Sequence, residues 1–208
     1  MKLFIRAIMA GVAISMGGII YLTLDNHIAG SLLFTIGLFT IYSFGLNLYT
    51  GKVCYIINER PAYLLTVLIV YLGNFVGTVG SGYVMRHTRL VKLVEHTREI
   101  VGLKLSDTLF STFIMAVMCG ILMCIAVLGF LNIKDSVGKH LALILPIMVF
   151  ILSGYEHSIA DMFYFTMANV WSTKALLYII IISLGNLVGG NLIPLADKYA
   201  GDNKLANH

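Results

Sequence analysis

Charged residues are scarce in this chain. Only 12% of its 208 residues are Asp, Glu, Lys or Arg, whereas a soluble domain has about 25%. Hydrophobic residues make up 59%, and the mean hydropathy is +0.90. This balance excludes a soluble globular domain and predicts an all-α protein embedded in a lipid bilayer. The net charge of +4 predicts no nucleic-acid partner, because the basic residues lie between the apolar runs.

Cysteine and catalytic motifs are also scarce. The three cysteines, Cys54, Cys119 and Cys124, lie in or beside apolar runs without the spacing of metal ligands. They predict buried thiols. The sequence contains no HExxH sequence, P-loop or nucleophile elbow. It therefore predicts no enzyme activity, no metal site and no cofactor.

Long apolar runs are what the sequence has in abundance. A helix that crosses a bilayer needs about 20 apolar residues, so these runs predict six transmembrane helices in a single domain, residues 1–208. The first run follows Lys2 and Arg6, as in a signal peptide, but it has no small-residue cleavage site and we interpret it as helix 1. The runs are Ala7–Leu24, Ile28–Gly51, Pro61–Met85, Thr108–Ile133, His140–Thr173 and Ala175–Ala196.

The loops are short apart from residues 86–107, where apolar residues at near-helical spacing alternate with charges. This segment predicts an amphipathic helix at the membrane interface, and residues 198–208 predict a polar tail. With the N-terminus inside, eight basic residues flank the inner helix ends and six flank the outer ends. The bias favours cytoplasmic N- and C-termini in a plasma (inner) membrane.

A weak internal repeat ends the third and sixth runs. The stretch YLGNFVG begins at Tyr71, and SLGNLVGG begins at Ser183. Both contain Gly-Asn, then two other residues, then another glycine. Such glycines allow helices to pack closely, and packing alone would explain them. Their equivalent positions nevertheless predict two inverted halves of three helices each.

Both halves also contain an interrupted helix. The second run ends in GLNLYTGK (45–52), and the fifth contains SGYEHS (153–158). Matching interruptions in two inverted halves point to a binding site between them. Unwound backbone at membrane depth persists only where protein buries it or where it lines a cavity.

Three ionisable residues, Glu156, His157 and Asp161, lie in or just after the second interruption, inside an apolar run. Charge inside a membrane is costly, so such groups usually face a protein interior or a water-filled path. We expect Glu156 to accept hydrogen bonds from backbone N–H groups freed by the break, and His157 to face the path. Asp161, four residues further on, either orients His157 or packs against another polar group. A histidine satisfied inside the bundle is the structural alternative.

Four stretches, in chain order, resemble the formate/nitrite transporter family, which includes hydrosulfide channels. They are LYTGK (48–52), YLGNFVG (71–77), GYEHSIADM (154–162) and LGNLVGG (184–190). The resemblance runs nearly end to end. It implies an aquaporin-like inverted repeat of two three-helix halves with broken helices 2 and 5, a homopentamer, and passage of small monovalent anions such as formate, nitrite, hydrosulfide or lactate, often with protons.

The resemblance also implies roles for individual residues. His157 is the central pore histidine. Glu156, Asp161, Gly51 and Ser158 would support the broken helices. The remaining residues of the implied substrate pathway are Thr50, Leu48, Tyr49, Phe34, Leu38, Phe150 and Lys104.

Three positions depart from the family pattern. One is Tyr49, which stands where Phe is common. Gly120 follows Cys119 where the family often has Asn, and we expect it to remove an amide donor from the pore. Asp161 stands where the family usually has Asn, which adds a possible negative charge beside His157.

The implied mechanism has a bare anion meeting an apolar constriction, where His157 supplies a proton or a strong hydrogen bond. This predicts selectivity for the conjugate bases of weak acids. Three alternatives stay open: a channel for a neutral solute, an intramembrane enzyme that uses Glu156, His157 and Asp161, and a non-conducting scaffold.

Overall fold

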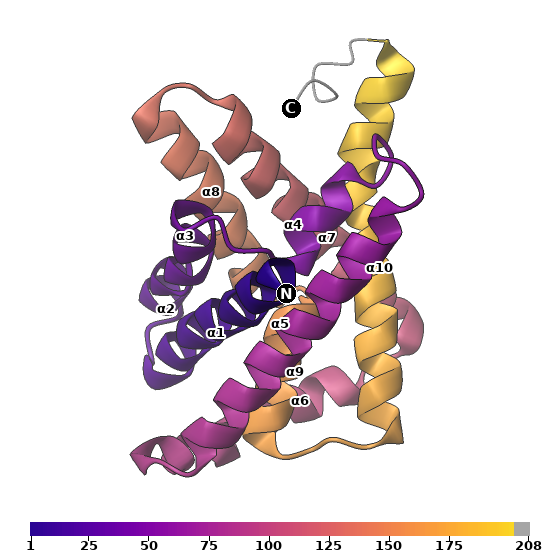
Figure 1. Cartoon of the computed structure of the whole chain (residues 1–208). Coiled ribbons are helices and arrows are strands. Elements are labelled where there is room, and N and C mark those ends of the chain that lie inside the picture. Colours follow the sequence, from indigo (N-terminus) through magenta and orange to yellow (C-terminus); the bar gives the residue numbers. More distant parts are fainter. Residues whose placement is uncertain (202–208) are drawn as a thin grey trace.

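Helices form all the regular structure in the computed structural model, which describes residues 1–201 (Figure 1). Each of the four longest is apolar enough to cross a membrane, and together they form the frame of the bundle. They are α1 (Lys2–Thr23), α5 (Tyr63–Arg86), α7 (Leu109–Asn132) and α10 (Thr173–Ala200).

The other two apolar runs are each interrupted by a non-helical break. Before the first break lie α2 (His27–Phe34) and α3 (Ile36–Ser43), and after it lie α4 (Tyr49–Lys52) and a 3-10 turn, η1 (Val53–Tyr55). The second break separates α8 (Ser136–Leu152) from α9 (Ser158–Ala168). Each break has a glycine with positive φ, Gly45 at 61° and Gly154 at 67°, a conformation that other residues rarely adopt. Four continuous and two broken segments agree with the predicted fold. The first break occupies the start of the stretch GLNLYTGK (45–52), because the helix resumes at Tyr49.

Glycines let the long helices of each half touch backbone to backbone. In the first half Gly77 on α5 lies against the carbonyl of Ile8, and in the second half Gly189 on α10 lies against the carbonyl of Val117. A Cβ at either glycine would overlap that carbonyl oxygen. Close packing is therefore one role of the repeated glycines, in both halves alike.

Two buried asparagines hold the broken segments. Asn74 on α5 accepts from the backbone N–H of Tyr49 at 2.8 Å and donates to the carbonyls of Asn47 and Ala7. Asn186 on α10 repeats each contact in the second half. It accepts from the N–H of Ser158 at 2.9 Å and donates to the carbonyls of Glu156 and Ala116. One amide thus satisfies both sides of each break, in a region where water is scarce.

Residues 86–107 form a 3-10 turn, η2 (Arg89–Leu93), and α6 (Val94–Ser106), which packs against α9 at the lower end of the bundle in Figure 1. The location of this segment at a membrane interface stays a prediction. The helix α10 continues to Ala200 and is capped by Gly201, so the first residues of the predicted polar tail are helical. Residues 202–208 lie outside the part that the structure describes.

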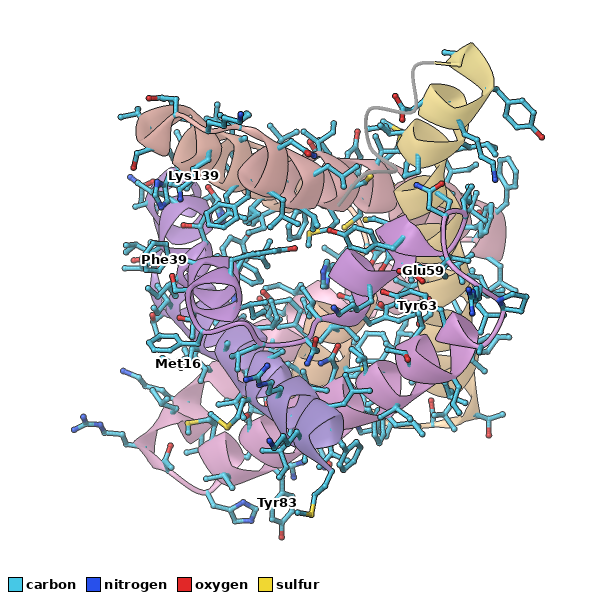
Figure 2. All side chains as sticks on the ribbon, turned by 45° about the horizontal axis from the view of Figure 1, so that its top comes forward. Met16, Phe39, Glu59, Tyr63, Tyr83 and Lys139 are labelled. Carbon is cyan, nitrogen blue, oxygen red and sulfur yellow. The ribbon has the colours of Figure 1, made fainter. Side chains whose placement is uncertain are left out.

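Apolar side chains cover much of the outer surface. Figure 2 shows Met16 and Phe39 at one edge of the bundle, and these side chains are 49% and 44% exposed. Large exposed apolar areas mark contact with lipid or with another protein. The surface therefore fits a chain whose outer face does not meet water.

We expect Asn186→Ala to destabilise the protein strongly, because it leaves one backbone donor and two carbonyls unpaired in the core. Each such buried group costs about 1–3 kcal/mol. Thermal unfolding in detergent should show a large fall in the melting temperature, and Asn74→Ala should show a similar fall.

Asn191→Ala is the matched control on the same helix. Asn191 makes one side-chain bond, to the carbonyl of Leu187, and its Oδ1 has no partner within residues 1–201. Its loss should cost much less. Equal falls for Asn186→Ala and Asn191→Ala would contradict the role assigned to Asn186.

Candidate functional site

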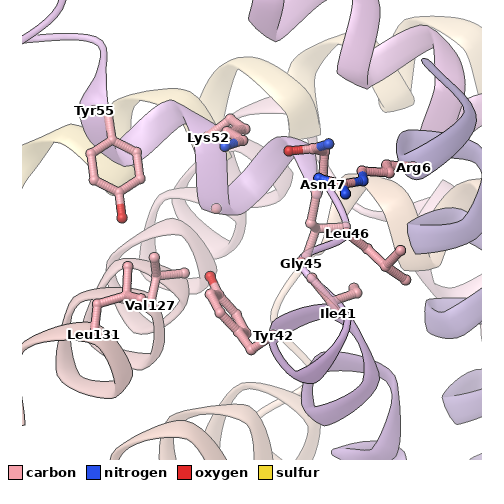
Figure 3. Close-up of a pocket in the computed structure, with 12 residues that line it drawn as sticks. Arg6, Ile41, Tyr42, Gly45, Leu46, Asn47, Lys52, Tyr55, Val127 and Leu131 are labelled. Carbon is pink, nitrogen blue, oxygen red and sulfur yellow. The ribbon is translucent and has the colours of Figure 1, made fainter. Parts of the chain in front are cut away.

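Two cavities open beside the two breaks. The Arg6 cavity, of about 380 Å³, lies beside the first break and is shown in Figure 3. Arg6 and Lys52 contribute its cations, and the hydroxyl of Tyr42 points into it. Because two cations and no carboxylate within residues 1–201 line this cavity, it attracts anions.

The Lys104 cavity, of about 90 Å³, lies beside the second break. It brings together five residues that sequence reasoning had assigned to the site. They are Phe34, Lys104, Phe150, His157 and Asp161.

The two cavities are related by the internal repeat. Residues 41, 42, 45, 46, 48, 51, 52 and 55 of the first lining correspond to residues 150, 151, 154, 155, 157, 160, 161 and 164 of the second, at a constant separation of 109 positions (157 minus 48). Leu48 therefore occupies the place of His157, and Lys52 occupies the place of Asp161. The backbone of the two halves is related by the repeat, but the side chains at equivalent positions differ in polarity and charge.

An apolar barrier separates the cavities, which share no lining residue among those described. Phe34 and Phe150 pack edge to face with ring centroids 6.1 Å apart. On the other side Leu48, 3% exposed, closes the Arg6 cavity. A charged solute would lose its hydration shell between them, which is expensive without a compensating donor.

His157 stands at this barrier with both ring nitrogens engaged. Nδ1 accepts the backbone N–H of Ala160 at 3.1 Å and so caps α9. Nε2 lies 3.1 Å from Oγ1 of Thr50, and the ring stacks on Phe150 at 5.5 Å. Because Nδ1 accepts, Nε2 carries the proton of the neutral ring and donates to Thr50. The Thr50 hydroxyl, fully buried, then has its own proton to offer.

The side chain of Glu156 has a different partner from the one expected. Its Oε2 accepts from Nζ of Lys104 at 2.5 Å, and the same ammonium lies 3.1 Å from Oδ1 of Asp161. The backbone groups freed by the break go to Asn186. Asp161 therefore packs against another polar group, Lys104, which is one of the two alternatives predicted for it.

The remaining sequence-predicted residues differ in where they lie relative to the two cavities. Tyr49 packs its ring on Tyr71 and donates its hydroxyl to the carbonyl of Ser183, and Leu38 is fully buried; neither lines a cavity. Gly51 lines the Arg6 cavity, and the backbone of Ser158 is held by Asn186.

The expectation for Gly120 is wrong. A Cβ at this position would lie 2.5 Å from the carbonyl oxygen of Asn186 and 2.9 Å from the backbone nitrogen of Gly190. Gly120 therefore faces α10 rather than the pore, and a larger side chain has no room there.

Sequence reasoning missed two sets of residues. Arg6, Lys52, Tyr42 and Tyr55 line the first cavity and were not predicted as site residues, although Lys52 ends the interrupted stretch 45–52. The roles of Asn74 and Asn186 at the breaks could have been predicted, since each Asn stands at the same place in the repeated glycine motif.

No group of three or more His, Cys, Asp or Glu side chains within residues 1–201 has the arrangement of a metal site. What the site offers instead is a cation at each mouth, an apolar barrier, and a histidine–threonine hydrogen bond within it.

Comparison with known proteins identifies relatives that are membrane channels and transporters for small anions. A family described as "Formate/nitrite transporter" matches residues 1–198. "Formate channel FocA" of Haemophilus influenzae is 25% identical over 94% of this chain and 85% of that protein. "Formate-nitrite transporter" of Plasmodium knowlesi is 28% identical over 77% of this chain, but only 58% of that protein is covered. A solved structure described as "Pentameric formate channel with formate bound" superposes with a TM-score of 0.85, at 25% identity, and covers 98% of this chain and 97% of that one.

The family match extends over nearly the whole chain, and the fold and the two breaks fit it. The chain belongs to the formate/nitrite transporter family of membrane channels and transporters, and it is not an enzyme.

Proposed function

We propose that this chain forms a pore for small monovalent anions of weak acids, formate or nitrite in type, and that protons take part in the passage. The observation that carries the proposal is His157, whose Nε2–H donates to Thr50 inside an apolar barrier between two cation-lined cavities. A donor placed there stabilises an anion where it has lost its water.

The cations at the mouths would draw anions in. Arg6 and Lys52 line one cavity, whose described lining contains no carboxylate, so this cavity raises the local concentration of anions. Lys104 lines the other cavity together with Asp161, so the attraction of anions there depends on how far Asp161 and Glu156 offset the charge of Lys104. The smaller cavity, at about 90 Å³, has room for a few waters or one small anion, which favours solutes of the size of formate.

The hydrogen-bond pattern favours a relay over a permanently charged histidine. A second proton on Nδ1 of His157 would set an N–H against the N–H of Ala160 and break the cap of α9. In the neutral ring, Nε2–H donates to Thr50, whose hydroxyl proton is then directed to the solute. A weak-acid anion that takes up a proton here crosses the barrier as a neutral molecule, whereas chloride has no such route.

We further infer a homopentamer with one pore in each protomer. The pentameric relative with a TM-score of 0.85 supports this assembly, and so do the apolar outer faces of the helices. More basic residues flank the helix ends on the membrane side that holds the N-terminus than on the opposite side. This excess supports cytoplasmic termini in a plasma (inner) membrane. A hydrosulfide- or lactate-selective member of the same family is the alternative.

The proposal predicts fast uptake of formate and nitrite into proteoliposomes and very slow uptake of chloride. Stopped-flow measurements with hydrosulfide and lactate in the same series would rank the weak-acid anions. Equal rates for formate and chloride, or no flux of any anion from correctly inserted protein, would refute the proposed function.

His157→Asn should lower formate flux about tenfold or more, because an asparagine can still cap α9 but does not reproduce the Nε2–H donor. Thr50→Val removes the hydroxyl and should have a similar effect, while Thr50→Ser keeps it and should retain most of the flux. Unchanged formate flux and pH dependence in both His157→Asn and Thr50→Val would rule out the relay.

A further inference from the structure

The Lys104 cavity contains one cation between two carboxylates. Nζ of Lys104 lies 2.5 Å from Oε2 of Glu156 and 3.1 Å from Oδ1 of Asp161. The side chains are 15%, 7% and 1% exposed, respectively. We call these three residues the acidic triad. With all three ionised, its net charge is −1, and two of its members, Lys104 and Asp161, line the cavity that the proposed pathway crosses.

Asp161 is the member of the triad whose negative charge is least compensated by its neighbours. Its second oxygen, Oδ2, is buried and has no hydrogen-bond partner within the part of the chain that the structure describes. Lys104 already gives its shorter bond to Glu156. A buried carboxylate with a free oxygen is costly as an anion, and a proton on that oxygen would remove the cost.

Within residues 1–201, the groups around Asp161 include no second cation. Tyr21 comes from α1, Lys104 from α6 and Cys119 from α7, while Glu156, His157 and Tyr164 come from the second break and α9. Only Lys104 is positive at neutral pH, because the cap of α9 keeps His157 neutral. The charge of this mouth is therefore set by how many protons the two carboxyl groups hold.

The internal repeat supplies the contrast. Lys52 occupies the position of Asp161 in the first half, where it lines the Arg6 cavity. No carboxylate among the described residues lines that cavity, so its charge does not depend on a proton held by a carboxyl group of its lining. The same position in one scaffold thus carries opposite charges at the two ends of the pore.

We propose that Asp161 is a charge-setting residue of the pore, which makes access of anions from the α6 side depend on one proton that Asp161 and Glu156 hold between them. The inference rests on the proposed function. When the proton is present, the triad is neutral and Lys104 can attract an anion; when it is lost to water, the net charge of −1 repels the anion. The Arg6 cavity has no such dependence.

The test compares Asp161→Asn with the unaltered protein. The amide keeps the shape and its oxygen still accepts from Lys104, but it carries no charge. Formate uptake into proteoliposomes is measured at about pH 8 and about pH 5.5, where formate remains mostly ionised and exposed carboxylates keep their charge. The ratio of variant to unaltered flux is the readout, because changes in substrate protonation cancel in it.

We expect this ratio to be about ten at the higher pH, from removal of one charge within several ångströms of the path, and close to one at the lower pH. Glu99→Gln is the matched control. It removes an acidic charge from the same helix as Lys104, at a side chain that is 81% exposed, so its ratio should be close to one at both pH values. An Asp161→Asn ratio that is the same at both pH values would overturn the inference.

A second measurement avoids the variant. Infrared difference spectra of the unaltered protein, with ¹³C-labelled aspartate, should show one buried aspartic acid gaining a proton between about pH 8 and about pH 5.5, above the range of exposed carboxyl groups. No such band, or a band already complete at the higher pH, would overturn the inference. The two failures stay separate: absence of formate flux in the unaltered protein refutes the proposed function, and flux with a pH-independent ratio refutes only the role of Asp161.

Discussion

The pore depends on two side-chain amides. A channel through a helical bundle needs helices that stop at membrane depth, and each stop frees backbone groups that lipid cannot satisfy. Asn74 and Asn186 each accept one N–H and donate to two carbonyls, so each break costs no unpaired group at these positions. Both cavities lie beside the breaks that these amides stabilise.

The two asparagines also fix where the short helices begin. Tyr49 and Ser158 begin α4 and α9 at the same distance past each break, with their N–H groups held by the amides. The same arrangement of amide and backbone therefore starts a helix after each break, in both halves of the bundle.

The sequence predicted the elements that local pattern determines. Charge-free runs identified the six apolar segments, and the repeated Gly-Asn motif indicated two inverted halves. The positions of both breaks followed from glycine and polar residues inside apolar runs, and the structure places Gly45 and Gly154 there with positive φ. These features were predictable because they lie within one helix or one loop.

Contacts between distant segments were not predictable in the same way. Lys104 meets Glu156 across 52 positions, and no local pattern states which carboxylate a lysine reaches. Gly120 was misinterpreted because its neighbour across the helix interface, Asn186, cannot be read from its own sequence. Tyr49 was placed in the pathway for its position in a motif, but its hydroxyl reaches Ser183 instead.

The distribution of charge follows from what conduction requires. An ion must bind well enough to enter and weakly enough to leave. A free lysine beside a narrow, half-dry cavity would hold an anion too tightly, since Coulomb attraction grows as the dielectric falls. Glu156 and Asp161 reduce that attraction at Lys104, and the neutral His157–Thr50 pair replaces a full charge at the barrier with a hydrogen bond. Cations at the mouths with only a dipolar donor between them attract anions without trapping them.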